Sequence, residues 1–235
     1  MLEAIILAGG AGTRLRSVVA DLPKPMADVA GRPFLAYQLD YLAAAGIRRI
    51  VLSVGYLRER IIEWFGASYR GIDIDYAIEE ELLGTGGALR VSLARVSGER
   101  VLVLNGDTWF PVDIAAMAAA HAESGCVMTM ALKELTDFSR YGAVTVADGR
   151  VNGFSEKGFC SRGYINGGVY LIECALEARF PERKRFSLES DLLEAQVGAI
   201  AICPFISDAY FIDIGVPEDY HTAQLELPEQ IGAYA

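Results

Sequence analysis

The sequence is poor in the residues that build zinc sites and disulfide frameworks. Its four cysteines are widely spaced, with no CxxC pair among them: Cys126, Cys160, Cys174 and Cys203. The only two histidines, His121 and His221, fall in segments predicted to be helical and have no partner at metal-ligand spacing. Zinc sites need clustered Cys and His ligands, so none is predicted. We expect reduced, buried thiols and histidines that serve packing.

The sequence also lacks a long hydrophobic run and an excess of positive charge. Glycines interrupt the first apolar stretch long before the roughly 18 residues that a membrane span needs, and no basic segment precedes it. We therefore expect no signal peptide, no membrane partner and a cytoplasmic location. Lys and Arg number 21 against 31 Asp and Glu, a net charge of -10 that opposes binding to nucleic acid. A small phosphorylated substrate remains possible, because local cations and Mg²⁺ act at short range.

The 235 residues, 52% of them hydrophobic, are predicted to form one catalytic domain over 1–235. Short apolar runs typical of buried strands alternate with amphipathic stretches in a β-α-β-α-β pattern through residue 78, and a further helix and a central strand follow up to residue 107. A helix is predicted between Pro33 and Gly46. From about 126 the pattern shifts toward strands, with a hairpin at 148–149, and a helix is predicted from about Pro217. We divide the chain into a nucleotide-binding half, about 1–125, and a sugar-binding half, about 126–235.

A glycine-rich segment, 7–15, follows the first predicted strand, and Leu-Pro-Lys-Pro-Met follows at 22–26. Glycines let backbone N–H groups approach phosphate closely, and Arg14 and Lys24 would neutralise its charge. No Walker A lysine follows the glycines, and the GxGxxG pattern of dinucleotide binders is missing. The alternative is a glycine-rich turn beside two solvated cations.

In this order the two segments resemble the signature of the sugar-1-phosphate nucleotidyltransferases, LAGGxGTRL followed by PKP. The resemblance implies an α/β, Rossmann-like three-layer sandwich with a mixed, mostly parallel central sheet. It implies nucleotidyl transfer from an NTP to a sugar 1-phosphate, with Mg²⁺ as cofactor. The nucleotide-binding residues it implies in this region are Leu7, Ala8, Gly9, Gly10, Gly12, Thr13, Arg14 and Lys24.

Two aspartates are predicted to bind the metal. Asp107 ends a central strand in Asn105-Gly106-Asp107, and Asp213 begins Asp213-Ile214-Gly215. The resemblance implies that such a pair binds Mg²⁺, which accepts one or two carboxylates together with substrate phosphates. Taken singly, each aspartate could equally be a turn or helix-cap residue.

Glu79 precedes a second glycine-rich stretch, which resembles the base-recognition segment of the family and includes Gly84, Thr85 and Gly86. A carboxylate can accept both the N1–H and N2–H of guanine, which favours GTP. Thymine and uracil each offer one N–H, so dTTP and UTP stay open. The alternative for Glu79 is a solvated acidic run with Glu80 and Glu81.

The sugar-binding residues are implied by the resemblance alone. Glu156-Lys157 and Asn166-Gly167 correspond to the EK and N-x-G segments of the family, with the lysine at the sugar phosphate. Asn105 and Gly142 are further candidates, although Gly142 could belong to a plain hairpin turn. The proline that usually follows EK is Gly158 here, which leaves the sugar contacts open.

The predicted reaction is direct in-line attack by the sugar phosphate on the α-phosphorus of the NTP, without a covalent enzyme intermediate. Arg14 and Lys157 would bind the reacting phosphates, and Lys24 would balance charge between the substrates. The short chain and residues 82–89 are most similar to the D-glycero-D-manno-heptose 1-phosphate guanylyltransferases. Mannose 1-phosphate guanylyl transfer and glucose 1-phosphate thymidylyl or uridylyl transfer remain alternatives. So do a catalytically silent regulatory homologue and, more weakly, a dinucleotide-dependent oxidoreductase; a homodimer is possible.

Overall fold

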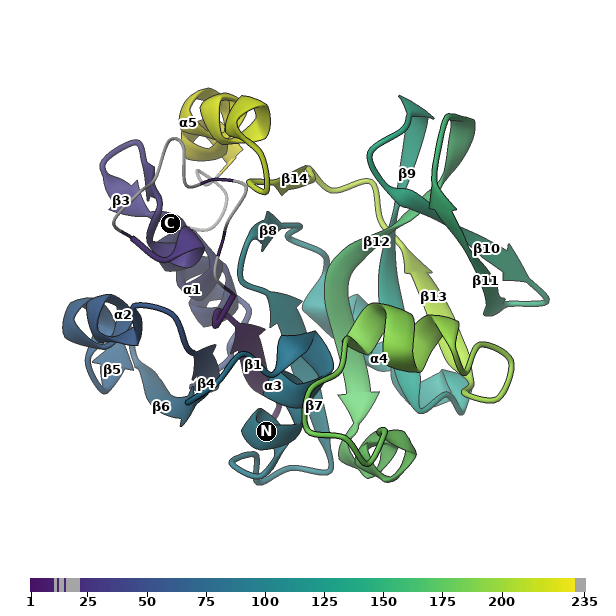
Figure 1. Ribbon diagram of the computed structural model, residues 1–235, viewed down its shortest axis with the longest axis horizontal. Helices are drawn as coiled ribbons and strands as arrows, with labels where there is room; N and C mark the ends of the chain where they lie inside the picture. Colours follow the sequence, from purple (N-terminus) through teal and green to yellow (C-terminus); the bar gives the residue numbers. More distant parts are fainter. Residues whose placement is uncertain (11, 13–14, 16–21, 231–235) are drawn as a thin grey trace.

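The structure, a computed structural model, describes residues 1–10, 12, 15 and 22–230 (Figure 1). Its helices are α1 (Phe34–Ala44), α2 (Arg58–Phe65), α3 (Gly84–Leu93), α4 (Ile114–Ser124) and α5 (Pro217–Gln230), with the short turns η1 (Lys24–Met26), η2 (Cys174–Arg179) and η3 (Leu188–Glu194). The strands of the first half are β1 (Glu3–Leu7), β2 (Asp28–Val29), β3 (Arg32–Pro33), β4 (Arg49–Val54), β5 (Ser68–Tyr69), β6 (Ile72–Ile78), β7 (Arg100–Asn105) and β8 (Thr108–Trp109). Those of the second half are β9 (Met128–Phe138), β10 (Gly142–Ala147), β11 (Arg150–Lys157), β12 (Cys160–Glu173), β13 (Ile202–Ile206) and β14 (Ile212–Asp213).

One sheet of ten strands runs through both halves of the chain. Its central strands β6, β4, β1 and β7 are parallel neighbours. The long strand β12 pairs antiparallel with β7, and it also pairs antiparallel with β9 and β10. Strand β13 extends the sheet by pairing in parallel with β9. This mixed sheet with a parallel centre confirms the predicted fold class, and it places the carboxyl ends of β1, β6 and β7 at one edge.

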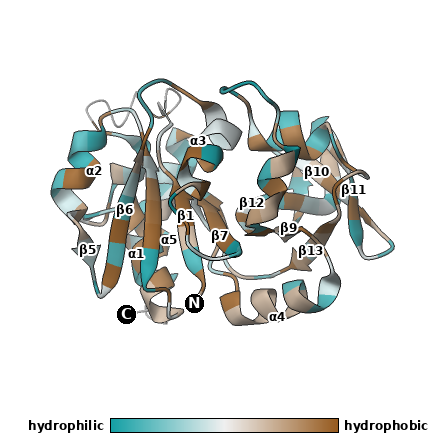
Figure 2. Cartoon of the chain, turned by 90° about the horizontal axis from the view of Figure 1, so that it is seen from below, coloured by the Kyte–Doolittle hydropathy of each residue, from teal (hydrophilic) through white to brown (hydrophobic). Residues whose placement is uncertain are grey.

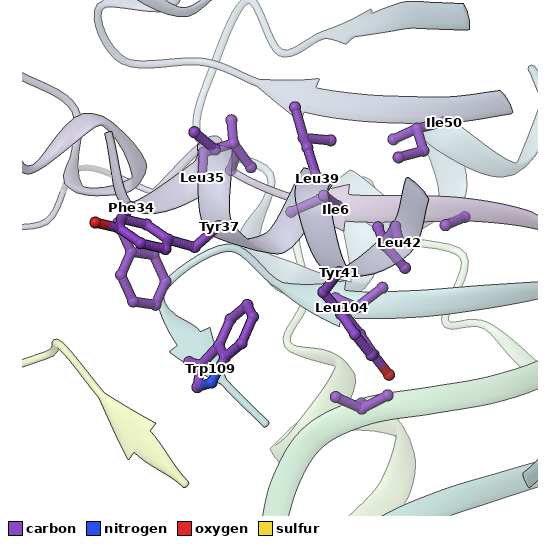
Figure 3. Packing of buried hydrophobic residues seen from close by; sticks show 14 of the residues in the cluster. Ile6, Phe34, Leu35, Tyr37, Leu39, Tyr41, Leu42, Ile50, Leu104 and Trp109 are labelled. Atoms are coloured by element: carbon purple, nitrogen blue, oxygen red, sulfur yellow. The ribbon is translucent and has the colours of Figure 1, made fainter. Parts of the chain in front are cut away.

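Helices cover both faces of the sheet because its central strands are apolar on both sides. In β1, Ile6 packs with α1 while Ile5 packs with α3, so the two cores meet at the strand. Figure 2 shows that these central strands consist largely of hydrophobic residues, drawn in brown, and that they lie between helices. Figure 3 shows Leu35, Leu39 and Leu42 of α1 among the buried residues of one core.

Local signals placed several elements correctly. Pro33 caps α1 and Gly46 follows its end with φ of +84°, as expected for a helix between them. The predicted hairpin is the β10–β11 turn, where Asp148 and Gly149 both have positive φ. The helix predicted from Pro217 is α5, and Figure 1 shows that it lies beside β3 and α1, on the half of the fold built by the N-terminal residues.

The prediction of four reduced thiols is wrong for two of them. Cys126 and Cys203 form a disulfide, whereas Cys160 and Cys174 are free. Parallel pairing of β13 with β9 sets Cys203 opposite Thr129, three positions from Cys126. The 77 residues between the two cysteines hide this proximity in the sequence.

The structure also shows where the two histidines lie. His121 is buried on α4 between Thr129 and Glu173, as a packing role requires, and His221 lies on α5 with its ring nitrogen 2.7 Å from the carbonyl of Pro217. Within residues 1–10, 12, 15 and 22–230, no helix has both the length and the apolar character of a bilayer-spanning segment.

Candidate active site

A cavity of about 400 Å³ lies at the carboxyl edge of the parallel strands. Its walls come from the ends of β1 and β7, from Glu79 directly after β6, and from the first turn of α3. This is where open α/β sheets bind ligands, because loops from neighbouring strands diverge there. The volume falls within the range of small-molecule sites.

Most of the predicted nucleotide-binding residues border this cavity. They are Leu7, Ala8, Gly9, Gly10, Gly12, Lys24, Glu79, Gly84, Thr85 and Asp107. Asn105, predicted to bind sugar, borders it too. Thr13 and Arg14 lie outside the described residues. Gly86 does not border the cavity; instead the ring of Phe186 packs directly against it.

Glycine is required in the first loop because other groups approach its backbone closely. A Cβ at Gly9 would overlap the Oε1 of Glu79. Gly12 has φ of +57°, and a Cβ there would lie 3.1 Å from the Cβ of Lys24. These glycines therefore let Glu79 and Lys24 reach the loop, which adds to their expected contact with phosphate.

Glu79 is not part of a solvated acidic run. It is buried at 7% exposure, whereas Glu80 and Glu81 are exposed. The Oγ of Ser53 donates to its Oε1 at 3.0 Å, and the backbone N–H of Leu83 points at its Oε2 at 3.4 Å. Burial raises the pKa of Glu79, and these two hydrogen bonds oppose the rise. A buried carboxylate at the cavity wall can accept hydrogen bonds from a ligand.

Tertiary structure brings Asp107 and Asp213 together around Lys24. Strand β14 pairs with β8 so that Asp213 lies opposite Thr108, and the N–H of Ile214 donates to the carbonyl of Asp107. The Lys24 Nζ lies 2.5 Å from Asp107 and 3.6 Å from Asp213. Burial and then the charge of Asp107 raise the pKa of Asp213, while Lys24 opposes that rise.

The chemistry of this pair fits a hard divalent cation. Two carboxylates already share one cation, the Lys24 ammonium, at hydrogen-bonding or ion-pairing distance. Mg²⁺ prefers oxygen ligands and needs only one or two carboxylates when substrate phosphates and water complete its shell. Asp107 and Asp213 therefore remain the predicted metal ligands; no cluster of three or more Asp, Glu, His or Cys residues suited to a metal occurs in the described part of the chain.

The remaining predicted sugar-binding residues lie away from the cavity wall. Glu156 and Lys157 are exposed at the end of β11, and Gly142 is paired with Lys157 in the ladder. Asn166 donates to the hydroxyl of Tyr170 at 2.7 Å, and Gly167 packs against the ring of Phe110. Asn105 connects the two regions, because its side chain contacts Gly168 and also borders the cavity.

Comparison with known proteins decides the family. Residues 3–230 match the pattern described as nucleotidyl transferase. The chain belongs to the nucleotidyl transferase family. It is 48% identical over 230 residues to the D-glycero-alpha-D-manno-heptose 1-phosphate guanylyltransferase of Aneurinibacillus thermoaerophilus, covering 98% of this chain and 100% of the relative. It is 33% identical to a mannose-1-phosphate guanylyltransferase of Mycobacterium tuberculosis, covering 96% of this chain and 64% of that protein.

A solved structure agrees with these relatives. HddC of Yersinia pseudotuberculosis, crystallised as a complex with GMP-PN, is 36% identical and superposes with a TM-score of 0.84, covering 97% of this chain and 100% of that one.

This nucleotidyl transferase also has site residues that sequence reasoning missed. Arg185 borders the cavity from the loop between η2 and η3, although its basic neighbourhood looks like a solvated run in the sequence. Gln38 is buried on α1, and its Nε2 donates to the carbonyls of Asn105 and Thr108 at 2.8 Å each. It thereby positions the backbone on both sides of Asp107. A glutamine within an apolar helix was the available signal for that role.

Proposed function

We propose that this chain transfers a guanylyl group from GTP to D-glycero-α-D-manno-heptose 1-phosphate and releases pyrophosphate. The observation that carries the proposal is the full-length similarity, at 48% identity, to a heptose 1-phosphate guanylyltransferase. The cavity supports it chemically, since it combines a glycine-rich loop, two carboxylates beside a lysine, and a buried glutamate. The product, a GDP-linked heptose, would be used in the synthesis of a surface polysaccharide.

The choice of GTP rests on Glu79. A carboxylate accepts two hydrogen bonds side by side, and guanine presents N1–H and N2–H in that arrangement. Adenine and cytosine have a lone pair at the corresponding ring nitrogen, so a carboxylate would repel them. Ser53 and Leu83 use part of the acceptor capacity of Glu79 and orient the rest toward the cavity.

The proposed chemistry is one in-line displacement. An oxygen of the sugar phosphate attacks the α-phosphorus of GTP, a new P–O bond forms, and the bond to the β-phosphate oxygen breaks. Because the attacking phosphate is already an oxyanion, no general base is needed, and catalysis consists of positioning and charge neutralisation. Lys24 and Arg14 would stabilise the growing negative charge, and Lys157 would bind the sugar phosphate.

Asp107 and Asp213 would hold Mg²⁺, which when bound neutralises phosphate charge. Lys24 already contacts both carboxylates, so it offsets one of their two negative charges without the metal and would stay beside the phosphates with it. Gln38 would keep Asp107 in place through the backbone. Asn105, Gly142, Glu156, Asn166 and Gly167 remain the proposed sugar-binding residues.

A pyrophosphate-release assay tests the proposal. GTP, ATP, CTP, UTP and dTTP are each combined with Mg²⁺ and with the 1-phosphates of heptose, mannose and glucose. The highest kcat/KM is expected for GTP with the heptose. Turnover confined to dTTP or UTP with glucose 1-phosphate would overturn it, and no release with any pair would favour the regulatory homologue.

The second candidate is a mannose-1-phosphate guanylyltransferase, which the 33% identity to the mycobacterial protein favours. Both enzymes would use GTP and would share Glu79 and the aspartate pair. The same assay distinguishes the two candidates. For the second candidate, the kcat/KM with GTP would be higher for mannose 1-phosphate than for heptose 1-phosphate.

A further inference from the structure

Arg185 is a cation at the cavity whose side chain has no described partner. It lies in residues 181–187, between η2 and η3, and borders the cavity. Its neighbour Arg183 is 2.7 Å from Asp191, and Arg90 donates to the carbonyls of Arg183 and Pro181. Across the residues that the structure covers, Arg185 itself makes no ion pair and no side-chain hydrogen bond. Its guanidinium is therefore available to a ligand.

The backbone of Arg185 is fixed by the next residue. Phe186 donates its N–H to the carbonyl of Leu83 at 3.0 Å, and its own carbonyl accepts from the N–H of Gly86 at 3.0 Å. The Phe186 ring covers Gly86, and a Cβ at Gly84 would lie 2.6 Å from the Phe186 carbonyl oxygen. The glycines of this stretch therefore allow the loop to pack on the first turn of α3.

Leu83 connects this loop to Glu79. Its N–H points at the Oε2 of Glu79, and its carbonyl accepts from Phe186. Glu79 and the residue that follows Arg185 are thus both hydrogen-bonded to the backbone of Leu83, and Glu79 and Arg185 both border the cavity. Glu79 therefore offers a hydrogen-bond acceptor to the cavity and Arg185 offers hydrogen-bond donors. Lys24, a second cation of the cavity wall, is paired with Asp107.

We propose that Arg185 recognises the O6 and N7 atoms of guanine, beside the N1–H and N2–H edge assigned to Glu79. A guanidinium presents parallel N–H donors that match these two acceptors. Adenine has an amino group in place of O6, and pyrimidines have no N7. Glu79 alone accepts one N–H from uracil or thymine, so Arg185 supplies discrimination that Glu79 lacks. The inference rests on the proposed use of GTP.

The test compares GTP with 7-deaza-GTP, which lacks only the N7 acceptor. The kcat/KM and the Kd from calorimetry are measured for the unmodified protein, Arg185→Ala, Arg185→Lys and Lys184→Ala. We expect the unmodified protein to lose about 5- to 10-fold on 7-deaza-GTP. Arg185→Ala should lose roughly 5- to 150-fold on GTP and should no longer distinguish the two nucleotides.

The other two variants are controls. Lys184→Ala removes the adjacent cation, which does not border the cavity, and should behave as the unmodified protein. Arg185→Lys keeps the charge without the two parallel donors and should not restore discrimination. Thermal melting checks that each variant is folded.

Three outcomes would overturn the inference. Unchanged GTP binding in Arg185→Ala would show that Arg185 does not contact the guanine base. An equal loss on both nucleotides, with discrimination retained, would show that Arg185 binds phosphate. No discrimination by the unmodified protein would exclude a contact to N7. The proposed function fails separately, if the unmodified protein neither binds GTP nor turns it over, and the inference then fails with it.

Discussion

Among single residues, Lys24 and its two aspartate partners are charged groups that the fold partly removes from water. The side chain of Lys24 is 10% exposed and that of Asp213 is 23% exposed, and both lie in a protein of net charge -10. Partly buried charges are tolerated when they are paired, and removing one partner is costly. Lys24 and the two aspartates therefore depend on one another before any substrate binds.

Replacement of Asp107 by Ala should lower kcat by at least about 10²-fold, the scale of losing one electrostatic stabiliser. The variant removes one of two proposed metal ligands and the closest partner of Lys24. Steady-state kinetics at increasing Mg²⁺ measures the effect. Asp113→Ala, which removes an N-cap of α4 instead, is the control. Near-normal turnover by the Asp107 variant would refute the metal assignment.

Glu79 predicts a pH dependence of GTP binding. Its ionised form accepts two N–H groups, and protonation converts one acceptor into a donor. Because burial raises the pKa of Glu79 above its ordinary 4.5, the ionised form is lost at a higher pH than for a solvated glutamate. The KM for GTP should therefore rise as the pH falls through that raised pKa. Glu79→Gln should have a higher KM that lacks this rise.

The measurement is the KM for GTP in steps from neutral pH downward, with both proteins in the same buffers. Substrate phosphates also titrate in acid, but they do so equally for the two proteins. An identical rise in Glu79→Gln would assign the pH effect to the substrates.

At the scale of secondary-structure elements, the glycines of α3 serve packing as well as ligand approach. Gly84, Gly86 and Gly87 contact the loop 184–186 rather than open space. Thr85 adds a side-chain bond to Glu189 of η3, and it accepts from the N–H of Leu188. The first turn of α3, which borders the cavity, is thus held in place by contacts with η3 and with the loop that precedes η3.

Replacement of Gly86 by Ala should lower the free energy of unfolding by roughly 1–3 kcal/mol, as overpacking does. The new methyl would overlap the Phe186 ring. Gly158→Ala is the matched control, because nothing lies within 4 Å of its Cβ position; its effect should stay within about 0.5 kcal/mol. Urea unfolding measures both. An equal, small effect for the two variants would mean that the loop does not pack on α3 as described.

At the scale of the whole molecule, β12 and α5 join the two halves, whereas the disulfide lies within the second half. β12 pairs with β7 on one side and β9 on the other. The hydroxyl of Tyr220 on α5 donates to the carbonyl of Asp28, and Asp219 pairs with Arg140 at 2.5 Å. One domain over 1–235 remains our prediction, and this continuous sheet is its support.

Reduction of the Cys126–Cys203 disulfide should lower the free energy of unfolding by about 2–4 kcal/mol, since the bond closes a long loop. Alkylation of the unfolded, non-reduced protein followed by mass spectrometry should label Cys160 and Cys174 alone. Cys126→Ser should make the stability insensitive to reductant. Labelling of all four cysteines would show that Cys126 and Cys203 are reduced and form no disulfide.

The alternation of strands and helices, the glycine-rich loop after β1 and the candidate aspartates were predictable from the amino-acid sequence alone. These follow from local rules: apolar periodicity, glycine freedom, and the position of a polar residue at a strand end. The helix from Phe34 and the hairpin at Asp148-Gly149 are examples.

Which distant groups meet became visible in the folded chain and could not be predicted from local patterns. The pairing of β14 with β8 brought Asp213 to Asp107, and β13 with β9 brought Cys203 to Cys126. Burial separated Glu79 from Glu80, which look alike in the sequence, and loop packing on α3 took Arg185 to the cavity. Long-range pairing and the exclusion of water are properties of the assembled chain, so no local pattern could have supplied them.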